Sequence, residues 1–453
     1  MENLPGDIIT NISSRLPADS VLCVKMVCRN WNRSIKIDTW FTNIHLCRFL
    51  HNCDYYVTND DIYSPCMKKQ RRNDGTGSTH VARRDLTLSI STMIESFLFL
   101  AKSYGISPKK TIYYGECFYD EDRVVFKKFT GGYNFNHPTF YQSKKYTAPL
   151  PMKTTHTLVG SCNGLVCFAV SDSSRLVGGD PIYICNPVTR EEWNLPRYNF
   201  IDSIYNYEAV IVTSGFCYVP STNQYKVVRV CYHLNEYIGD LQVFTLGVDK
   251  TWRHKEIIPY FLLNFFKITN ATPGVIADGA IHWMDYLEWK IVAFNFEDEV
   301  VLEVPTPRCC FDFQESDDGT GSPGLLELKV LRDCLCLVHR RPGRSVDIWS
   351  LKKMNMCSCE TSNGMISKKC KKDCRDWRWI KEFSIAIEIK EIEYIPVPFA
   401  ITKTGRILLW YYRSGLSIYD PKTETLSKIP DGDIGTFVYQ VIPHVNTFVS
   451  LKV

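Results

Sequence analysis

Four cysteines in the polar stretch 354–376 come closest, by type and spacing, to a chemical site. Cys357 and Cys359 form a C-x-C pair, and Cys370 and Cys374 follow after ten residues as a C-x-x-x-C pair. Four thiolates satisfy tetrahedral zinc, and the lysines beside them favour the thiolate form. The spacing is not that of a standard zinc ribbon, and a surface loop with incidental cysteines is the alternative that we favour. We therefore expect no metal site and no cofactor, and these four residues are the zinc candidates.

Motifs for catalysis are absent from the sequence. It contains neither His-Glu-x-x-His nor Gly-x-Ser-x-Gly, and no catalytic set of Ser, His and Asp or pair of carboxylates rises above chance. Tryptophans recur within strand-like segments, where we interpret them as core rather than as a ligand platform: Trp193, Trp252, Trp283 and Trp349. We expect no catalytic residues and predict that the protein is not an enzyme.

Composition places the chain among ordinary globular proteins of more than one domain. Its 453 residues exceed the size of one usual core, and 45% hydrophobic with 23% charged residues are globular values. A net charge of +4 does not indicate a nucleic-acid-binding protein. No run of 18 apolar residues and no basic-then-apolar leader are present, so we expect the cytoplasm or nucleus and no membrane partner. Because the cytoplasm and nucleus keep thiols reduced, most of the 19 cysteines should not form disulfides.

The N-terminal residues predict two or three short helices with an excess of apolar surface. Ile8, Ile9, Ile12 and Leu16 share one face of a helix with a period of 3.6 residues. Pro5 lies near the first helical position, Pro17 ends this helix, and Asp19 is the N-cap expected for the next. A bundle below about 40 residues usually needs a partner or a larger neighbour to be stable.

These residues, in order and spacing, resemble the F-box. The matching positions are Leu4, Pro5, Ile8, Ile9, Ile12, Arg15, Leu16, Pro17, Ser20, Leu22, Val27, Cys28, Arg29, Trp31 and Ile35. The resemblance implies that the helices bind the Skp adaptor of a cullin-based ubiquitin ligase, through all of these positions except Arg15, Ser20, Arg29 and Ile35. An N-terminal helical cap packed on its own domain is the alternative.

Beyond about residue 110 the pattern changes to short runs of β-branched and aromatic residues separated by turns. A hairpin that often carries Trp or Phe and ends near Pro recurs at roughly 50 to 70 residues, the range of a four-stranded propeller blade. The hairpins are expected at 116–129, 183–196, 241–253, 292–305, 346–353 joined to 377–383, and 416–430.

A second hairpin should precede most of these if each blade has four strands, and candidates occur at 156–170, 209–232, 275–284, 326–339 and 398–412. The count gives about six blades. A hairpin at 437–453 would complete the blade begun at 112–129 and close the ring, which removes open sheet edges. An open stack of sandwiches is the alternative.

Several phrases in this part of the chain resemble the plant F-box-associated domain: Gly160–Cys167, Cys185–Arg190, Gly215–Val228, Gly279–Trp283 and Tyr419–Thr423. The fold class predicted is therefore a multidomain α+β chain. An F-box at 1–50 is followed by a connecting segment at 51–111 and a Kelch-like β-propeller at 112–453.

The two resemblances together imply a substrate-recognition subunit of an SCF-type ligase, with an unidentified target protein on the propeller. A propeller enzyme acting on a small molecule or glycan is the alternative. The basic run Lys68–Arg72 lies in the connecting segment, where it is a nuclear import signal or a solvated linker.

Overall fold

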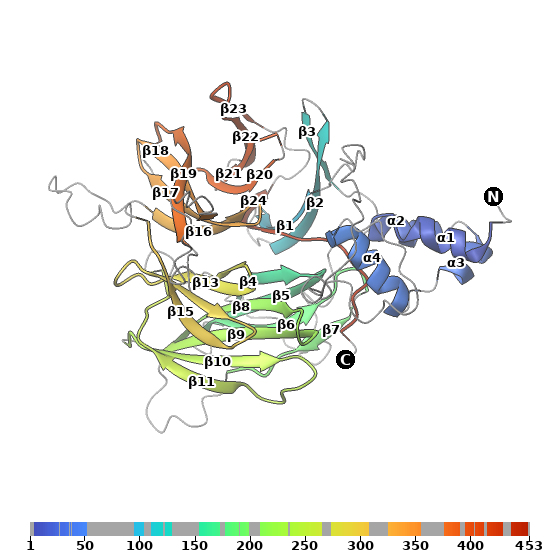
Figure 1. The fold of residues 1–453 in the computed structure, drawn as a ribbon, viewed down its shortest axis with the longest axis horizontal. Coiled ribbons are helices and arrows are strands. Elements are labelled where there is room, and N and C mark those ends of the chain that lie inside the picture. The colour runs from blue at the N-terminus through green and yellow to red at the C-terminus, as the bar shows by residue number, and fades with distance from the viewer. Residues whose placement is uncertain are drawn as a thin grey trace, which may run out of the picture.

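A computed structural model describes the chain from residue 4 to residue 451, apart from 27, 36, 38, 52–94, 104–109, 121–122, 129–153, 173–176, 190, 199–208, 234–235, 265–272, 308–324, 355–375, 390–394, 403, 412–414 and 429–435. Short helices come first and strands follow, as the sequence predicts (Figure 1). The helices are α1 (Gly6–Ser13), α2 (Ala18–Lys25), α3 (Arg29–Ser34) and α4 (Thr39–His51). None of the described helices is long and apolar enough to cross a membrane.

The described strands form six consecutive four-stranded antiparallel units, which we call blades 1 to 6. The second and third units are joined into one eight-stranded sheet, because Val177 and Gly178 of one pair in parallel with Val210 and Ile211 of the other. Blade 1 contains β24 (Thr436–Pro443), β1 (Glu95–Ser103), β2 (Lys110–Asp120) and β3 (Arg123–Lys128). Blade 2 contains β4 (Thr154–Cys162), β5 (Leu165–Asp172), β6 (Val177–Cys185) and β7 (Glu192–Asn194). Blade 3 contains β8 (Val210–Val219), β9 (Gln224–His233), β10 (Gly239–Thr245) and β11 (Arg253–Ile258).

The other three blades follow the same order. Blade 4 contains β12 (Val275–Ala277), β13 (Ala280–Met284), β14 (Ile291–Asn295) and β15 (Val300–Val304). Blade 5 contains β16 (Leu325–Leu331), β17 (Cys334–Arg341), β18 (Ser345–Met354) and β19 (Asp376–Ala386). Blade 6 contains β20 (Val397–Ile401), β21 (Ile407–Tyr411), β22 (Gly415–Asp420) and β23 (Thr425–Lys428). The predicted propeller of about six blades is confirmed.

Turn residues with positive φ explain why the hairpins form where the sequence places them. Asn163–Gly164 joins β4 to β5, and Asp278–Gly279 joins β12 to β13, with both residues of each pair at positive φ. Two-residue turns of this kind match the twist of antiparallel strands, and Asn-Gly and Asp-Gly adopt them with least strain. These turns fix the register of the inner strands.

Apolar contacts join each blade to the next. Clustered side chains fill the spaces between blades 2 and 3, 3 and 4, 4 and 5, and 5 and 6. Leu98 of β1 packs with Leu158 of β4, which joins blade 1 to blade 2. Phe97 of the same strand meets Phe399 of β20, at 5.2 Å between ring centroids, which joins blade 1 to blade 6. The ring is therefore closed, and the open stack is excluded.

The closure differs in one respect from the predicted pairing of two hairpins. A single C-terminal strand, β24, pairs with β1, and β1 in turn pairs with β2. Strand β1 lies inside the predicted connecting segment 51–111, so the predicted boundary at 112 is corrected to Glu95. The apolar run around β1 is compatible with helix or strand by periodicity, and its partner β24 lies more than 300 residues away in the sequence.

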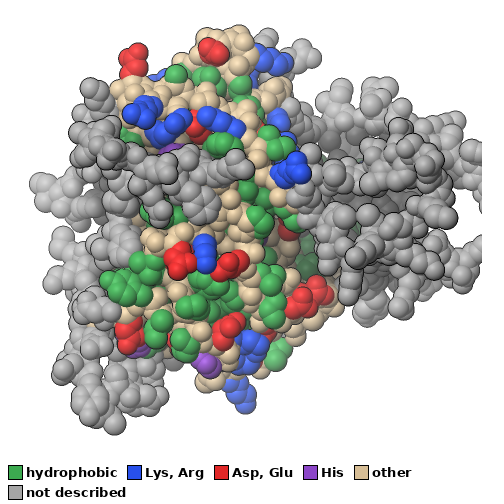
Figure 2. Space-filling model, turned by 60° about the vertical axis from the view of Figure 1, so that its left-hand side comes forward, with side chains coloured by type: hydrophobic (Ala, Val, Ile, Leu, Met, Phe, Trp, Pro, Cys, Tyr) green, Lys and Arg blue, Asp and Glu red, His purple; other side chains and the backbone are tan. Residues whose placement is uncertain are grey.

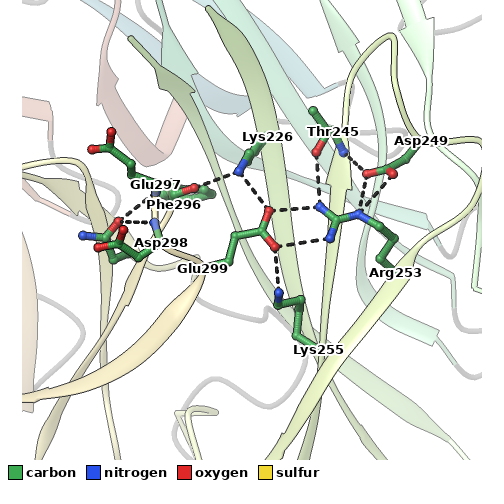
Figure 3. Close-up of polar contacts among 10 residues, drawn as sticks. Lys226, Thr245, Asp249, Arg253, Lys255, Phe296, Glu297, Asp298 and Glu299 are labelled. Atoms are coloured by element: carbon green, nitrogen blue, oxygen red, sulfur yellow. Dashed lines mark hydrogen bonds and ion pairs between the residues drawn. The ribbon is translucent and has the colours of Figure 1, made fainter. Parts of the chain in front are cut away.

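A carboxylate on blade 4 forms ion pairs with three basic side chains on blade 3 (Figure 3). Glu299, in the β14–β15 turn of blade 4, lies 2.8 Å from Lys226 Nζ, 2.9 Å from Arg253 Nη2 and 2.9 Å from Lys255 Nζ, all on blade 3. Burial acts to raise the pKa of Glu299, but hydrogen bonds from the three cations outweigh it and hold the pKa well below its usual range. This cluster clamps blade 3 to blade 4.

Replacing Glu299 by Gln should lower the free energy of unfolding by about 3 kcal/mol, because Lys226 is then buried without its counter-charge. The depressed pKa means that the stabilisation is present above the ordinary carboxyl pKa of about 4.3 and is lost as the pH falls below it. The substitution should therefore flatten the loss of stability between about pH 5 and pH 3. Urea unfolding at several pH values measures both effects.

The control is Glu303→Gln on the same blade. Glu303 pairs with Lys290 at 3.4 Å, and both side chains are well exposed, at 49% and 39%. Exposed pairs of this kind contribute less than about 1 kcal/mol. Equal destabilisation by the two substitutions would contradict the clamp.

The face of the propeller drawn in Figure 2 mixes basic, acidic and hydrophobic side chains. Several Lys and Arg side chains gather towards the top of the view, with acidic side chains also present there, and acidic, basic and hydrophobic side chains are mixed lower down. Ile257, Val300 and Leu302 are among the exposed hydrophobics, on the outer strands of blades 3 and 4. Single exposed apolar side chains are common on globular proteins, so they do not by themselves identify a docking surface.

Candidate functional site: the outward face of the N-terminal helices

The helical unit has a core of its own, completed by one residue from the other end of the chain. The buried members are Ile9, Ala18, Val21, Ile35, Phe41 and Phe448. Half-buried side chains surround this core, among them Leu4, Leu16, Leu22, Val24 and Trp31. The apolar residues that the sequence assigns to one binding face therefore divide between the core and the surface.

Helix α1 shows this division most clearly. Ile9 is fully buried, whereas Ile8 and Ile12 are each 42% exposed and lie one turn apart. Residues four positions apart are neighbours on a helix surface, so these two isoleucines form one apolar patch. Pro5 is exposed just before them. The predicted adaptor contact of Ile9 is corrected, because its side chain does not reach the surface.

Prolines set the starts of the first two helices. Pro5 is the N-cap of α1 and Pro17 is the N-cap of α2, both with extended backbone. A proline at a helix start has no N–H to leave unpaired. The sequence analysis predicts Asp19 as the N-cap of α2. Asp19 instead lies inside α2, because the helix already begins at Ala18. Pro17 thus ends one helix and opens the next.

The Cys-x-x-Trp portion of the motif has a local structural role. Cys28 is the N-cap of α3, and its Sγ accepts a hydrogen bond from the backbone N–H of Trp31 at 3.5 Å. The bond satisfies one of the N–H groups that a helix start leaves unpaired. Both residues are half-buried, so they orient α3 and support the surface rather than form its centre.

Helix α4 locks the end of α1 in place. Arg48 Nη1 donates to the carbonyl of Asn11 at 3.0 Å, and His45 Nε2 bonds the carbonyl of Leu16 at 2.9 Å. Burial lowers the pKa of His45 to about 4, although the bond to Leu16 opposes the shift. The ring is therefore neutral at pH 7, where it donates to that carbonyl while packing among aromatic side chains.

The helical unit exposes further apolar residues that the sequence analysis did not select. Met26 is 79% exposed after α2, and Trp40 is 37% exposed at the start of α4. An apolar side chain at a helix end carries no periodic signal, so the pattern could not assign it to either face. Val27, which the analysis did select, lies outside the described residues.

The zinc candidates Cys357, Cys359, Cys370 and Cys374 also lie outside the described residues, as does the basic run Lys68–Arg72. Within the part of the chain that the structure does describe, no group of three potential metal ligands comes together. The four tryptophans interpreted as core are buried or half-buried between blades, and Trp283 Nε1 donates to Thr213 Oγ1 at 3.1 Å.

Known protein families and relatives match both parts of the chain. Residues 1–41 match the F-box domain, and residues 117–315 match the F-box associated beta propeller domain. An F-box domain is thus followed by an F-box-associated β-propeller. An F-box protein of Arabidopsis thaliana is 25% identical over 93% of this chain and 86% of its own length. An F-box/kelch-repeat protein of the same plant is 26% identical over 48% of this chain and 55% of its own.

Because α1 has a buried side and an exposed side, substitutions of Ile9 and Ile12 should differ in their effect on stability. Ile9→Ala should destabilise the helices by about 3 kcal/mol, because it leaves a cavity in a small core. Ile12→Ala should change stability by less than about 0.5 kcal/mol, because the side chain is exposed. Amide hydrogen exchange of peptides from α1 to α4 measures the difference. Equal exchange in the two variants would contradict the assignment of core and surface.

Proposed function

We propose that this protein is the substrate-recognition subunit of an SCF-type ubiquitin ligase. In this proposal the F-box binds a Skp-type adaptor and, through it, a cullin, while the propeller binds a target protein. The observation that carries the proposal is the exposed Ile8–Ile12 patch on helices that match the F-box domain. The proposed function requires no catalytic residue in this chain. We expect the protein to act in the cytoplasm or nucleus.

The mechanism is proximity. A target held on the propeller has its lysines close to a ubiquitin-conjugating enzyme bound elsewhere in the complex, which raises their effective concentration. The rate then depends on how steadily the two domains hold the adaptor and the target relative to one another. A closed propeller supports this role because each blade is packed between two neighbours.

The patch has the chemistry of a helix-in-groove contact. Such contacts draw most of their affinity from a few apolar anchors on one helix face. Ile8 and Ile12 have that spacing, and Pro5 and Met26 are further exposed apolar residues of this helical unit. Leu16, Leu22 and Trp31 contribute less directly, since they pack between this surface and the core.

Replacing Ile8 and Ile12 together by Asp should reduce affinity for a purified Skp-type adaptor at least about 100-fold, because each buried anchor contributes about 2 kcal/mol or more. Calorimetric titration of the full chain measures the affinity. The matched control changes Leu302 and Leu426 to Asp. These leucines are 52% and 51% exposed on β15 and β23 of the propeller, so their replacement should leave the affinity unchanged.

The proposal fails if the wild-type chain does not bind the adaptor, or if the double α1 variant binds as tightly as wild type. Circular dichroism of each variant establishes that the strands and helices are retained. A loss of binding in the leucine control as well would point to general misfolding instead of a lost contact.

A further inference from the structure

The C-terminal segment after β24 contacts both domains at once. From His444 to Leu451 the chain leaves the propeller sheet and runs between α4 and blade 2 (Figure 1). The covalent path from α4 to β1 passes through residues 52–94, outside the described residues. The described contacts between the F-box and the propeller centre on the C-terminal segment, with Leu46 of α4 and Val188 of blade 2 packed against the two clusters that the segment joins.

Neighbouring side chains at the centre of this segment point to different domains. Thr447, Val449 and Leu451 face the propeller: Thr447 Oγ1 donates to the carbonyl of Asn163 at 2.6 Å, and the other two join the apolar cluster between blades 2 and 3. Phe448 faces the other way, into the core of the F-box. Alternation of this kind is the ordinary property of an extended chain.

Phe448 completes the F-box core with aromatic contacts. Its ring centroid lies 6.0 Å from that of Phe41 and 5.2 Å from that of His45, and the side chain is only 3% exposed. Its backbone carbonyl accepts a hydrogen bond from Thr42 Oγ1 at 3.4 Å. Three residues of α4 therefore hold a single residue of the C-terminal segment.

Blade 2 holds the same segment from the other side. Asn186 Nδ2 donates to the carbonyls of Thr447 and Val449, at 3.0 and 2.7 Å, and Asn186 is fully buried. Glu191 accepts a hydrogen bond from the backbone N–H of Leu451 at 2.7 Å. Gly164 is also required here, because a Cβ at this position would collide with the side chain of Thr447. These bonds leave the segment little freedom to shift.

We propose that residues 444–451 form a strap that fixes one orientation of the F-box on the propeller, with Phe448 as its positioning residue. Both domains are bound by one short backbone, so neither moves without breaking contacts of the strap. The proposal rests on the proposed function for its biological meaning, because the orientation sets the distance between a bound target and the adaptor.

The test measures the distance between the two domains directly. Spin labels are attached to ketone side chains introduced at Asn32 on α3 and at Lys422 in the β22–β23 turn, because the 19 native cysteines preclude thiol labelling. Double electron–electron resonance on the full chain should give one narrow distribution of the distance between the two labels for the wild type. Phe448→Ala should broaden it at least twofold, whereas Phe448→Leu, which keeps an apolar side chain in place, should stay close to wild type.

The control is Phe296→Ala. Phe296 is 1% exposed in the core between blades 3 and 4, so its loss weakens the propeller without touching the strap. It should lower the melting temperature and leave the distance distribution narrow. The proposal is overturned if Phe448→Ala keeps the wild-type distribution, or if Phe296→Ala broadens it equally.

Binding of a purified Skp-type adaptor is measured on the same samples. Phe448→Ala should keep that affinity within about threefold, because Ile8 and Ile12 lie on the outward face and do not belong to the core that Phe448 completes. A wild-type chain that fails to bind the adaptor overturns the proposed function, while the distance measurement still decides whether the strap exists.

Discussion

The pairing of β24 with β1 is the interaction on which the rest of this structure depends. A propeller has no hydrogen bonds across its centre, so the first and last blades must be joined by the two ends of the chain. Here the last strand pairs with the first along most of its length, and Gln440 adds side-chain bonds to the N–H and carbonyl of Leu158 on the neighbouring blade, at 2.8 and 2.6 Å. Without this strand, β1 would present an open edge.

Ring closure is also coupled to the F-box. The backbone N–H of His444 donates to the carbonyl of Ser96 at 2.9 Å, at the point where β24 ends. Only four residues further along, Phe448 enters the helical core. A helical unit of this size has too few apolar residues to bury without help. A residue from the propeller's last segment fills this core, while Ile8 and Ile12 remain exposed.

Buried polar contacts define how neighbouring blades meet. Between blades 2 and 3, Arg229 pairs with Asp180 at 2.8 Å and stacks over the ring of Trp252 at 4.0 Å. Between blades 3 and 4, Glu299 gathers its three cations. Apolar packing alone tolerates small shifts between sheets, whereas a buried charge is stable only opposite its partner. We infer that these contacts fix the relative positions of the blades, while the apolar clusters supply most of the stability.

The sequence by itself determined the local features of this protein: the order of the N-terminal helices, the hairpins, their turns and the number of blades. These follow from residue period, proline positions and pairs such as Asn163–Gly164, which act over a few residues. The tertiary structure alone decided that β1 belongs to the ring, that Ile9 is buried while Ile8 is exposed, and that Phe448 completes the F-box core. Each of these depends on contacts between segments far apart in the chain, and no local pattern specifies which distant segment will cover a given apolar face.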